Sequence, residues 1–107
     1  MLEIHEKKDT VGYEEIIDNI DCQYLHIVES MNGQETNGYG IYSVDENGII
    51  IYDFNSSDMN ITDGIIRTIL FKAMLSGINE CIFEIKNENK LHIIENLGFI
   101  KKNEKYI

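Results

Sequence analysis

The chain has no proline, no tryptophan and only two cysteines among its 107 residues. Because proline-rich and low-complexity stretches mark linkers and tails, their absence leads us to expect a single domain over residues 1–107. Neither the cysteines nor the three histidines have the spacing of metal ligands: Cys22, Cys81, His5, His26 and His92. We therefore expect no metal site, and we interpret both cysteines as reduced core thiols of a cytoplasmic protein.

Long apolar runs and basic residues are also scarce. No run of about 18 apolar residues occurs, so we expect no membrane-spanning helix. The first ten residues, MLEIHEKKDT, are charged and lack the apolar centre of a signal peptide, so we do not expect export. Nine Lys and Arg stand against nineteen Asp and Glu, which gives a formal net charge of −10. Because this charge repels phosphate backbones, we expect no nucleic-acid partner.

Short alternating apolar segments make up the middle of the chain. Stretches rich in Asn-Gly pairs join them, and the segments themselves lie at residues 24–28, 39–44 and 49–54. Alternation joined by Asn-Gly is the strongest short-range signal for hairpins. The sequence therefore predicts an antiparallel three-stranded meander over residues 23–54, with its first turn over residues 31–38.

The segment before the meander contains two weaker patterns. Residues 2–6 alternate as a strand would. Asp9 or Thr10 can cap a short helix over residues 11–20, whose apolar residues can share one face. We expect a first strand followed by this helix.

After the meander the apolar period changes to three and four residues. This period predicts an amphipathic helix around residues 65–74 that Thr62 or Asp63 caps and Gly77 ends. Later patterns predict a strand at 80–85, a helix at 88–97 and a closing strand at 99–107. The order indicates an α/β fold in the broad sense, with helices packed on a mixed sheet.

The stretch NENKLHIIENLGF resembles a motif of the GNAT superfamily of acyl-CoA-dependent N-acetyltransferases. The matching residues are Asn87, Ile93, Glu95, Leu97, Gly98 and Phe99. The family's pyrophosphate loop is matched upstream by Gly64, Ile65, Ile69 and Leu70. The interval between the two motifs also fits, and the resemblance covers about residues 23–107. It implies a GNAT-like fold, in which the meander is followed by helix–strand–helix–strand.

The resemblance also implies acetyl-CoA as the cofactor. The residues that would contact it are Phe54, Ser56, Gly64, Ile65, Ile66, Arg67 and Asn87. Three isoleucines depart from the family pattern. Ile61 replaces an Arg or Gln, and Ile66 replaces a Gly or Ala whose small size lets the phosphate approach. Ile94 replaces a Tyr that often protonates the departing thiolate, which a hydrocarbon cannot do. Arg67 either supplies the missing positive charge or lies solvated on the helix.

Asp53, at the end of the third meander strand, is the candidate general base. His26 is a second titratable candidate, and Glu29 and Glu84 are weaker ones; each also fits an ordinary position on a strand. Tyr52 accompanies Asp53 near the point where substrate and acyl group meet in the family.

Two functions follow from these residues. The first is an N-acetyltransferase that moves an acetyl group from acetyl-CoA to an unknown amine, either a small molecule or a protein amine. The acidic surface would steer a cationic amine toward it. The alternative is a catalytically inactive GNAT-fold binding or dimerisation module, which the three isoleucines favour. A homodimer is compatible with both, and a mixed α/β protein outside this superfamily is a third interpretation.

Overall fold

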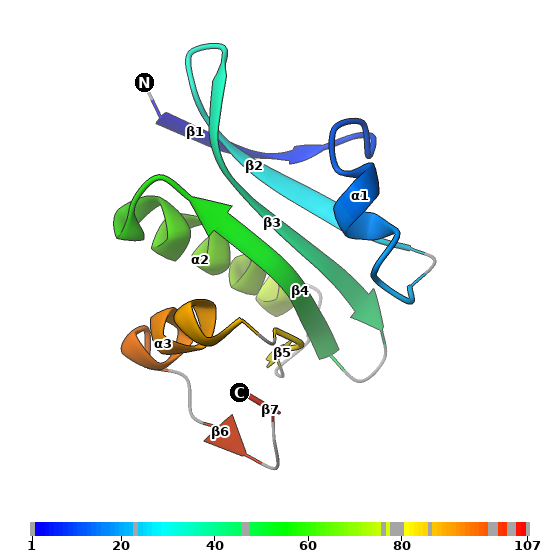
Figure 1. The fold of residues 1–107 in the computed structure, drawn as a ribbon, viewed down its shortest axis with the longest axis vertical. Helices are drawn as coiled ribbons and strands as arrows, with labels where there is room; N and C mark the ends of the chain where they lie inside the picture. The colour runs from blue at the N-terminus through cyan, green and yellow to red at the C-terminus, as the bar shows by residue number, and fades with distance from the viewer. Residues whose placement is uncertain are drawn as a thin grey trace.

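A computed structural model shows a five-stranded sheet with α2 on one face and α1 on the other (Figure 1). It describes residues 2–22, 24–45, 48–75, 77, 81–85, 87–98, 101–102 and 105–106. The strands lie side by side in chain order: β1 (Leu2–Lys7), β2 (His26–Asn32), β3 (Glu35–Asp45), β4 (Gly48–Ser56) and β5 (Cys81–Phe83). The first four are antiparallel neighbours, and β5 is parallel to β4. The predicted mixed sheet and first strand are therefore confirmed.

The meander is confirmed, although its first turn is tighter than predicted. The turn is Gly33–Gln34 instead of residues 31–38, because Asn32 already pairs with Glu35. Gly33 has φ 68°, a left-handed conformation that glycine adopts without steric cost. The second Asn-Gly pair lies inside β3.

A β-bulge in β4 decides which side chains enter the core. The register against β3 shifts between Ile51 and Asp53, so Tyr52 is an extra residue in β4. Strict alternation would place Asp53 on the same face as Ile51. The bulge reverses the alternation: Phe54 joins Ile51 in the core, 1% exposed, and Asp53 points to the opposite face.

Helix α1 (Glu14–Ile17) is much shorter than the predicted helix over residues 11–20. The residue at its N-cap is Tyr13, whose side chain makes no capping hydrogen bond, so the predicted caps are wrong. Asp9 instead accepts a hydrogen bond from the Val11 N–H in a turn before the helix. Val11, one of the apolar residues predicted to share a helical face, lies before the helix and is 67% exposed.

Helix α2 (Met59–Leu75) begins earlier than predicted. Asp58 caps it, because its Oδ1 accepts a hydrogen bond from the Ile61 N–H at 3.0 Å. Thr62, one of the two predicted caps, is buried inside the helix. Gly77 follows the helix with φ 76°, as the predicted C-terminal glycine requires.

Helix α2 packs closely on β3 because two glycines of β3 carry no side chain. A Cβ at Gly38 would lie 2.9 Å from Ile61 Cγ2, and a Cβ at Gly40 would lie 2.8 Å from Ile65 Cγ2. Isoleucines of α2 therefore rest directly on the strand backbone. The buried residues of the helix are Ile61, Thr62, Ile65, Ile66, Ile69 and Ala73. This contact is the centre of the core.

Helix α3 (Glu88–Asn96) begins after its N-cap Asn87 and is followed by Gly98 with φ 100°, close to the predicted bounds. Its Ile94 is fully buried in the core that α2 and the sheet share. No helix among the described residues is both long enough and apolar enough to cross a bilayer.

The C-terminal segment differs from the single closing strand predicted over residues 99–107. The structure has two short strands that pair with each other, β6 (Lys101–Lys102) and β7 (Lys105–Tyr106). The strand predicted at residues 80–85 is the shorter β5. Phe99, and residues 46–47 in the connection between β3 and β4, lie outside the described residues.

Candidate functional site

Strand β4 extends well beyond its parallel neighbour β5. Their pairing covers Ile49–Ile51 and Cys81–Phe83, and the Glu84 N–H donates to the Ile51 carbonyl at 2.9 Å. From there β4 continues to Ser56, while β5 ends. The end of β4 thus separates from β5 near the start of α2 and beside α3 (Figure 1).

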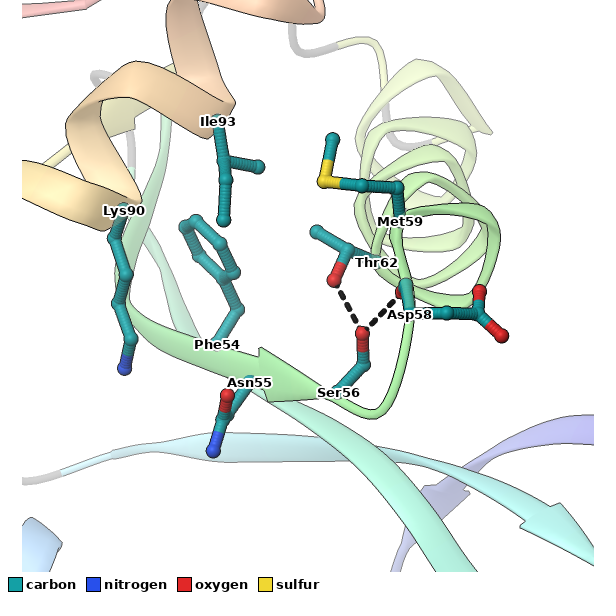
Figure 2. Close-up of a pocket in the computed structure, with 8 residues that line it drawn as sticks. All are labelled: Phe54, Asn55, Ser56, Asp58, Met59, Thr62, Lys90 and Ile93. Atoms are coloured by element: carbon teal, nitrogen blue, oxygen red, sulfur yellow. Dashed lines mark hydrogen bonds between the residues drawn. The ribbon is translucent and has the colours of Figure 1, made fainter.

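A pocket of about 160 Å³ lies between the end of β4, the start of α2 and α3 (Figure 2). Its lining residues are Phe54, Asn55, Ser56, Asp58, Met59, Thr62, Lys90 and Ile93. Figure 2 shows Phe54, Met59 and Ile93 facing one another across the hollow, whereas the Asp58 carboxylate points away from it. An apolar interior with a few polar groups at its rim is the usual composition of a small-molecule pocket.

Asp53 lies beside this pocket, and both of its carboxylate oxygens have partners. The Tyr39 hydroxyl donates to Oδ2 at 2.8 Å. Oδ1 forms an ion pair with the Lys90 ammonium at 2.5 Å and accepts a hydrogen bond from the Phe54 N–H at 2.9 Å. A general base needs an oxygen that faces the substrate. Lys90 must therefore move before Asp53 can accept a proton, and the predicted catalytic role of Asp53 stays a prediction.

The hydrogen bond to Asp53 also affects the Tyr39 hydroxyl. Burial, together with the hydrogen bond to the Asp53 carboxylate, raises the pKa of the Tyr39 hydroxyl well above its ordinary value. On its other side the ring packs edge-on against Tyr13, with ring centroids 5.1 Å apart. Tyr13 in turn donates to Glu29 at 2.5 Å. Glu29, a weaker candidate base, is therefore also engaged.

The first turn of α2 borders the pocket, and polar groups of the chain itself already form hydrogen bonds there. The Ser56 hydroxyl donates to the Asp58 carbonyl and also contacts the Thr62 hydroxyl, both at 2.5 Å. Asp58 Oδ1 occupies the Ile61 N–H. A helix N-terminus binds anions through its unpaired N–H groups and its positive dipole. Asp58 takes up one of these donors and places a negative charge nearby.

The residues that match the pyrophosphate motif do not lie at the N-terminus of α2. Gly64, Ile65 and Ile66 lie in the second turn of α2, so the predicted helix start is wrong. The side chains of Ile65 and Ile66 are 0% and 2% exposed and belong to the core. Arg67 is exposed, and its Nε donates to Asp63 at 2.8 Å. Contact between these residues and a cofactor stays a prediction.

Asn87 and Ile94 have structural roles on α3. Asn87 Oδ1 accepts a hydrogen bond from the Lys90 N–H at 3.2 Å and caps the helix. Ile94 is fully buried and is not among the residues that line the pocket. The position that holds the family's tyrosine therefore offers no proton to this site. Cofactor contact by Asn87 stays a prediction.

His26 lies outside the pocket lining, beside the other end of α2. Its Nδ1 is 3.3 Å from Glu6 Oε1, and its ring stacks on Tyr42. The Tyr42 hydroxyl donates to the same carboxylate at 2.7 Å, and Lys72 lies 3.5 Å from it. Burial acts to raise the pKa of Glu6, but the Tyr42 hydrogen bond and the charges of Lys72 and His26 lower it overall.

The two cysteines differ in their surroundings. Cys81 is buried, as predicted, and burial raises the pKa of its thiol to about 12. Cys22 is only half-buried and lies in the segment before β2, so its prediction as a core thiol is wrong. Both are free, and among the described residues no group of three His, Cys, Asp or Glu side chains could hold a metal ion.

Phe54 and Ser56 were predicted from the sequence to contact a cofactor, and both line the pocket. The sequence did not single out Lys90, Asp58 or Met59. One signal for Lys90 was available: it precedes Ile94 by four residues and so shares a face of α3 with the family's tyrosine position. Its partner Asp53 is 37 residues away in the sequence, a distance at which no local pattern operates.

Comparisons with known proteins support the fold. No protein-family model matches the sequence, and no curated protein matches it. Among solved structures, one similar chain is a protein assigned to the GNAT acetyltransferase family from Desulfovibrio desulfuricans. It is 11% identical with a TM-score of 0.71, and the match covers 95% of this chain and 87% of that one. Another is the candidate N-acetyltransferase YhhK from E. coli, solved with coenzyme A bound. It is 9% identical with a TM-score of 0.73, over 99% of this chain and 96% of that one. The predicted GNAT-like fold is confirmed.

Proposed function

We propose that this GNAT-fold protein is a cytoplasmic acetyltransferase that moves the acetyl group of acetyl-CoA to an amine. The observation that carries the proposal is the pocket between the end of β4, the first turn of α2 and α3. A volume of about 160 Å³ suits a thin acyl-thioester chain, whereas a nucleotide would have to lie outside it. The coenzyme A bound to the structurally similar YhhK supports the choice of cofactor.

Two parts of the chain would hold acetyl-CoA, which supplies an activated thioester carbonyl. The backbone of Phe54–Ser56 lies at the edge of β4 that β5 no longer covers. This edge can hydrogen-bond the amide groups of the pantetheine arm as a neighbouring strand would. The pyrophosphate would lie near the start of α2, outside the pocket, where helix N–H groups face outward.

Asp53 and Lys90 indicate how an amine would be received. The Lys90 ammonium already sits on the Asp53 carboxylate and 5.8 Å from the centre of the Phe54 ring. An incoming amine can take this place, because it carries the same charge and would meet the same carboxylate and aromatic face. The net charge of −10 would attract such a substrate by long-range steering.

The first test is thermal unfolding with and without acetyl-CoA, with free CoA alongside. A ligand at about 100 times its dissociation constant stabilises a protein by about 2.7 kcal/mol, which corresponds to a rise of about 10 °C for a chain of this size. Pantetheine alone and ADP alone serve as controls for the two ends of the cofactor. If millimolar acetyl-CoA leaves the unfolding temperature unchanged, the cofactor assignment is wrong.

A second candidate function is a dimerisation module without catalysis, and the exposed face of α2 favours it. Phe71, Met74 and Leu75 lie at helical spacing and are 60%, 71% and 73% exposed. The helix contains one acidic residue, Asp63, which is paired with Arg67. Because α2 carries no unpaired acidic side chain, the net charge of −10 opposes contact at this face little, and the partner we propose is another copy of this chain.

Sedimentation equilibrium tests this dimer. Leu75→Glu places a charge within this exposed apolar face and should convert a dimer into a monomer. Val11→Glu is the matched control, since Val11 is 67% exposed but lies outside α2. A wild-type chain that is monomeric at high micromolar concentration excludes this function.

A further inference from the structure

One of the residues that line the pocket carries an amine, Lys90. Lys90 contributes to the pocket lining, and its side chain is 22% exposed. It extends from the first turn of α3, whose cap Asn87 holds the Lys90 N–H. Asp53 then fixes the ammonium group at 2.5 Å. Figure 2 shows the Lys90 side chain at the rim of the pocket beside Phe54, with its Nζ directed away from the hollow and 5.8 Å from the centre of the Phe54 ring.

We infer that Lys90 is itself an acceptor, so that the protein acetylates its own Lys90 Nζ when acetyl-CoA is bound. This inference rests on the proposed function, because the acetyl group must first enter the pocket. Rotation of the Lys90 side chain away from Asp53 would bring Nζ to the pocket, and a nucleophile tethered next to an electrophile reacts as if it were present at a very high concentration. Among the described lysines, Lys7 and Lys72 do not line the pocket and have no such advantage.

The transfer balances as an ordinary aminolysis of a thioester. The Lys90 ammonium first loses one proton to solvent through Asp53, which leaves a neutral amine. Its nitrogen attacks the thioester carbonyl, a C–N bond forms, and the C–S bond breaks. The second nitrogen proton goes to the departing thiolate. The products are Nζ-acetyl-Lys90, free CoA and one proton released to solvent.

Acetylation would change the site itself. The amide has no charge, so the ion pair with Asp53 is lost and both the carboxylate and the Phe54 N–H can rearrange. Acetylated Lys90 can no longer occupy the carboxylate as a cation. The site would then present Asp53 to an external amine.

Peptide mass spectrometry after incubation with acetyl-CoA tests the inference, with Lys72 as the internal control. Lys72 also pairs with a carboxylate, that of Glu6, but it lies on α2 outside the pocket lining. We expect acetylation of Lys90 to exceed that of Lys72 by at least about tenfold. Lys90→Arg keeps the positive charge and should remove the major acetylated peptide, whereas Lys72→Arg should leave it. Equal, low acetylation of both lysines would overturn the inference.

Two further arms separate this inference from the proposed function. If acetyl-CoA raises the unfolding temperature while Lys90 stays unmodified, the cofactor assignment holds and self-acetylation is wrong. S-acetylpantetheine carries the thioester without the nucleotide and is used if acetyl-CoA gives no thermal shift. Selective acetylation of Lys90 by this probe would support the acceptor role although the nucleotide does not bind, and unselective labelling would reject it.

Discussion

Gly40 on β3 leaves no room for a side chain. An added Cβ would lie 2.8 Å from Ile65 Cγ2 and 3.0 Å from Ile69 Cδ1, and both atoms belong to fully buried side chains of α2. Gly40→Ala must therefore push the helix away from the sheet, and overpacking of this kind costs about 1–3 kcal/mol. Urea unfolding should show this loss of stability.

Gly64 provides the matched control, because it lies inside α2. Among the described residues, an added Cβ would meet Ile4 Cδ1 alone within 4 Å, at 2.9 Å, and this atom is the far end of a flexible side chain. Alanine also favours a helix interior over glycine by about 1 kcal/mol. Gly64→Ala should leave the free energy of unfolding unchanged or raise it. A loss as large as that of Gly40→Ala would contradict the helical placement of Gly64.

At the scale of elements, Asp58 has two effects at the start of α2. It caps the helix, and its negative charge disfavours the binding of an anion there. Asp58→Ala removes the oxygen that accepts from the Ile61 N–H and should lower stability by about 1 kcal/mol. Asp58→Asn keeps a capping oxygen but removes the negative charge. If pyrophosphate binds near this turn, Asp58→Asn should tighten CoA binding by about 2- to 5-fold. Urea unfolding measures the stability of Asp58→Ala, and titration calorimetry measures the CoA affinity of Asp58→Asn.

The control for this experiment is Asp63→Asn, which removes one negative charge in the second turn of α2. The effect of a charge on a helix terminus falls off within the first turn, so Asp63→Asn should change CoA affinity less than Asp58→Asn. Equal effects would indicate a response to net charge and not to a site at the helix start.

At the scale of the whole molecule, three tyrosines on both faces of the sheet link stability to pH. Burial, followed by a hydrogen bond to a carboxylate, raises the pKa of each hydroxyl above its ordinary value: Tyr13, Tyr39 and Tyr42. Their contribution is fully present below the unfolded-state pKa of about 10 and is lost as the pH rises above it. For Tyr42, which is 2% exposed, the loss reaches about 1.4 kcal/mol per pH unit.

Tyr42→Phe isolates this effect. Below pH 10 the variant should be less stable than the wild type, because Glu6 loses its hydrogen-bond donor. Above pH 10 the difference should shrink, because only the wild type carries this raised pKa. Urea unfolding at several pH values gives both curves. A difference that stays constant up to pH 11 would contradict the assignment.

Local patterns in the sequence were sufficient for the order of the elements from β1 to α3. Alternating apolar residues joined by Asn-Gly predicted the meander, and the three- and four-residue period predicted α2, because these signals act between near neighbours. The same reasoning failed where a local signal had two outcomes. Thr62 and Asp63 were the predicted caps of α2, but both lie inside the helix, and Asp58 caps it instead. Residues 11–20 contain only a four-residue helix, and Val11 is exposed and does not pack in the core.

The sequence by itself determined the fold class, the meander, the glycines after α2 and α3, and the isoleucines that replace the family's functional residues. The tertiary structure decided which polar groups meet. The bulge at Tyr52 turns Phe54 into the core and Asp53 to the other face, and this depends on register with β3. Lys90 reaches Asp53 only because α3 folds back beside β4. Contacts of this kind join residues far apart in the chain, and their energy depends on burial and geometry that exist only after the sheet and helices have packed.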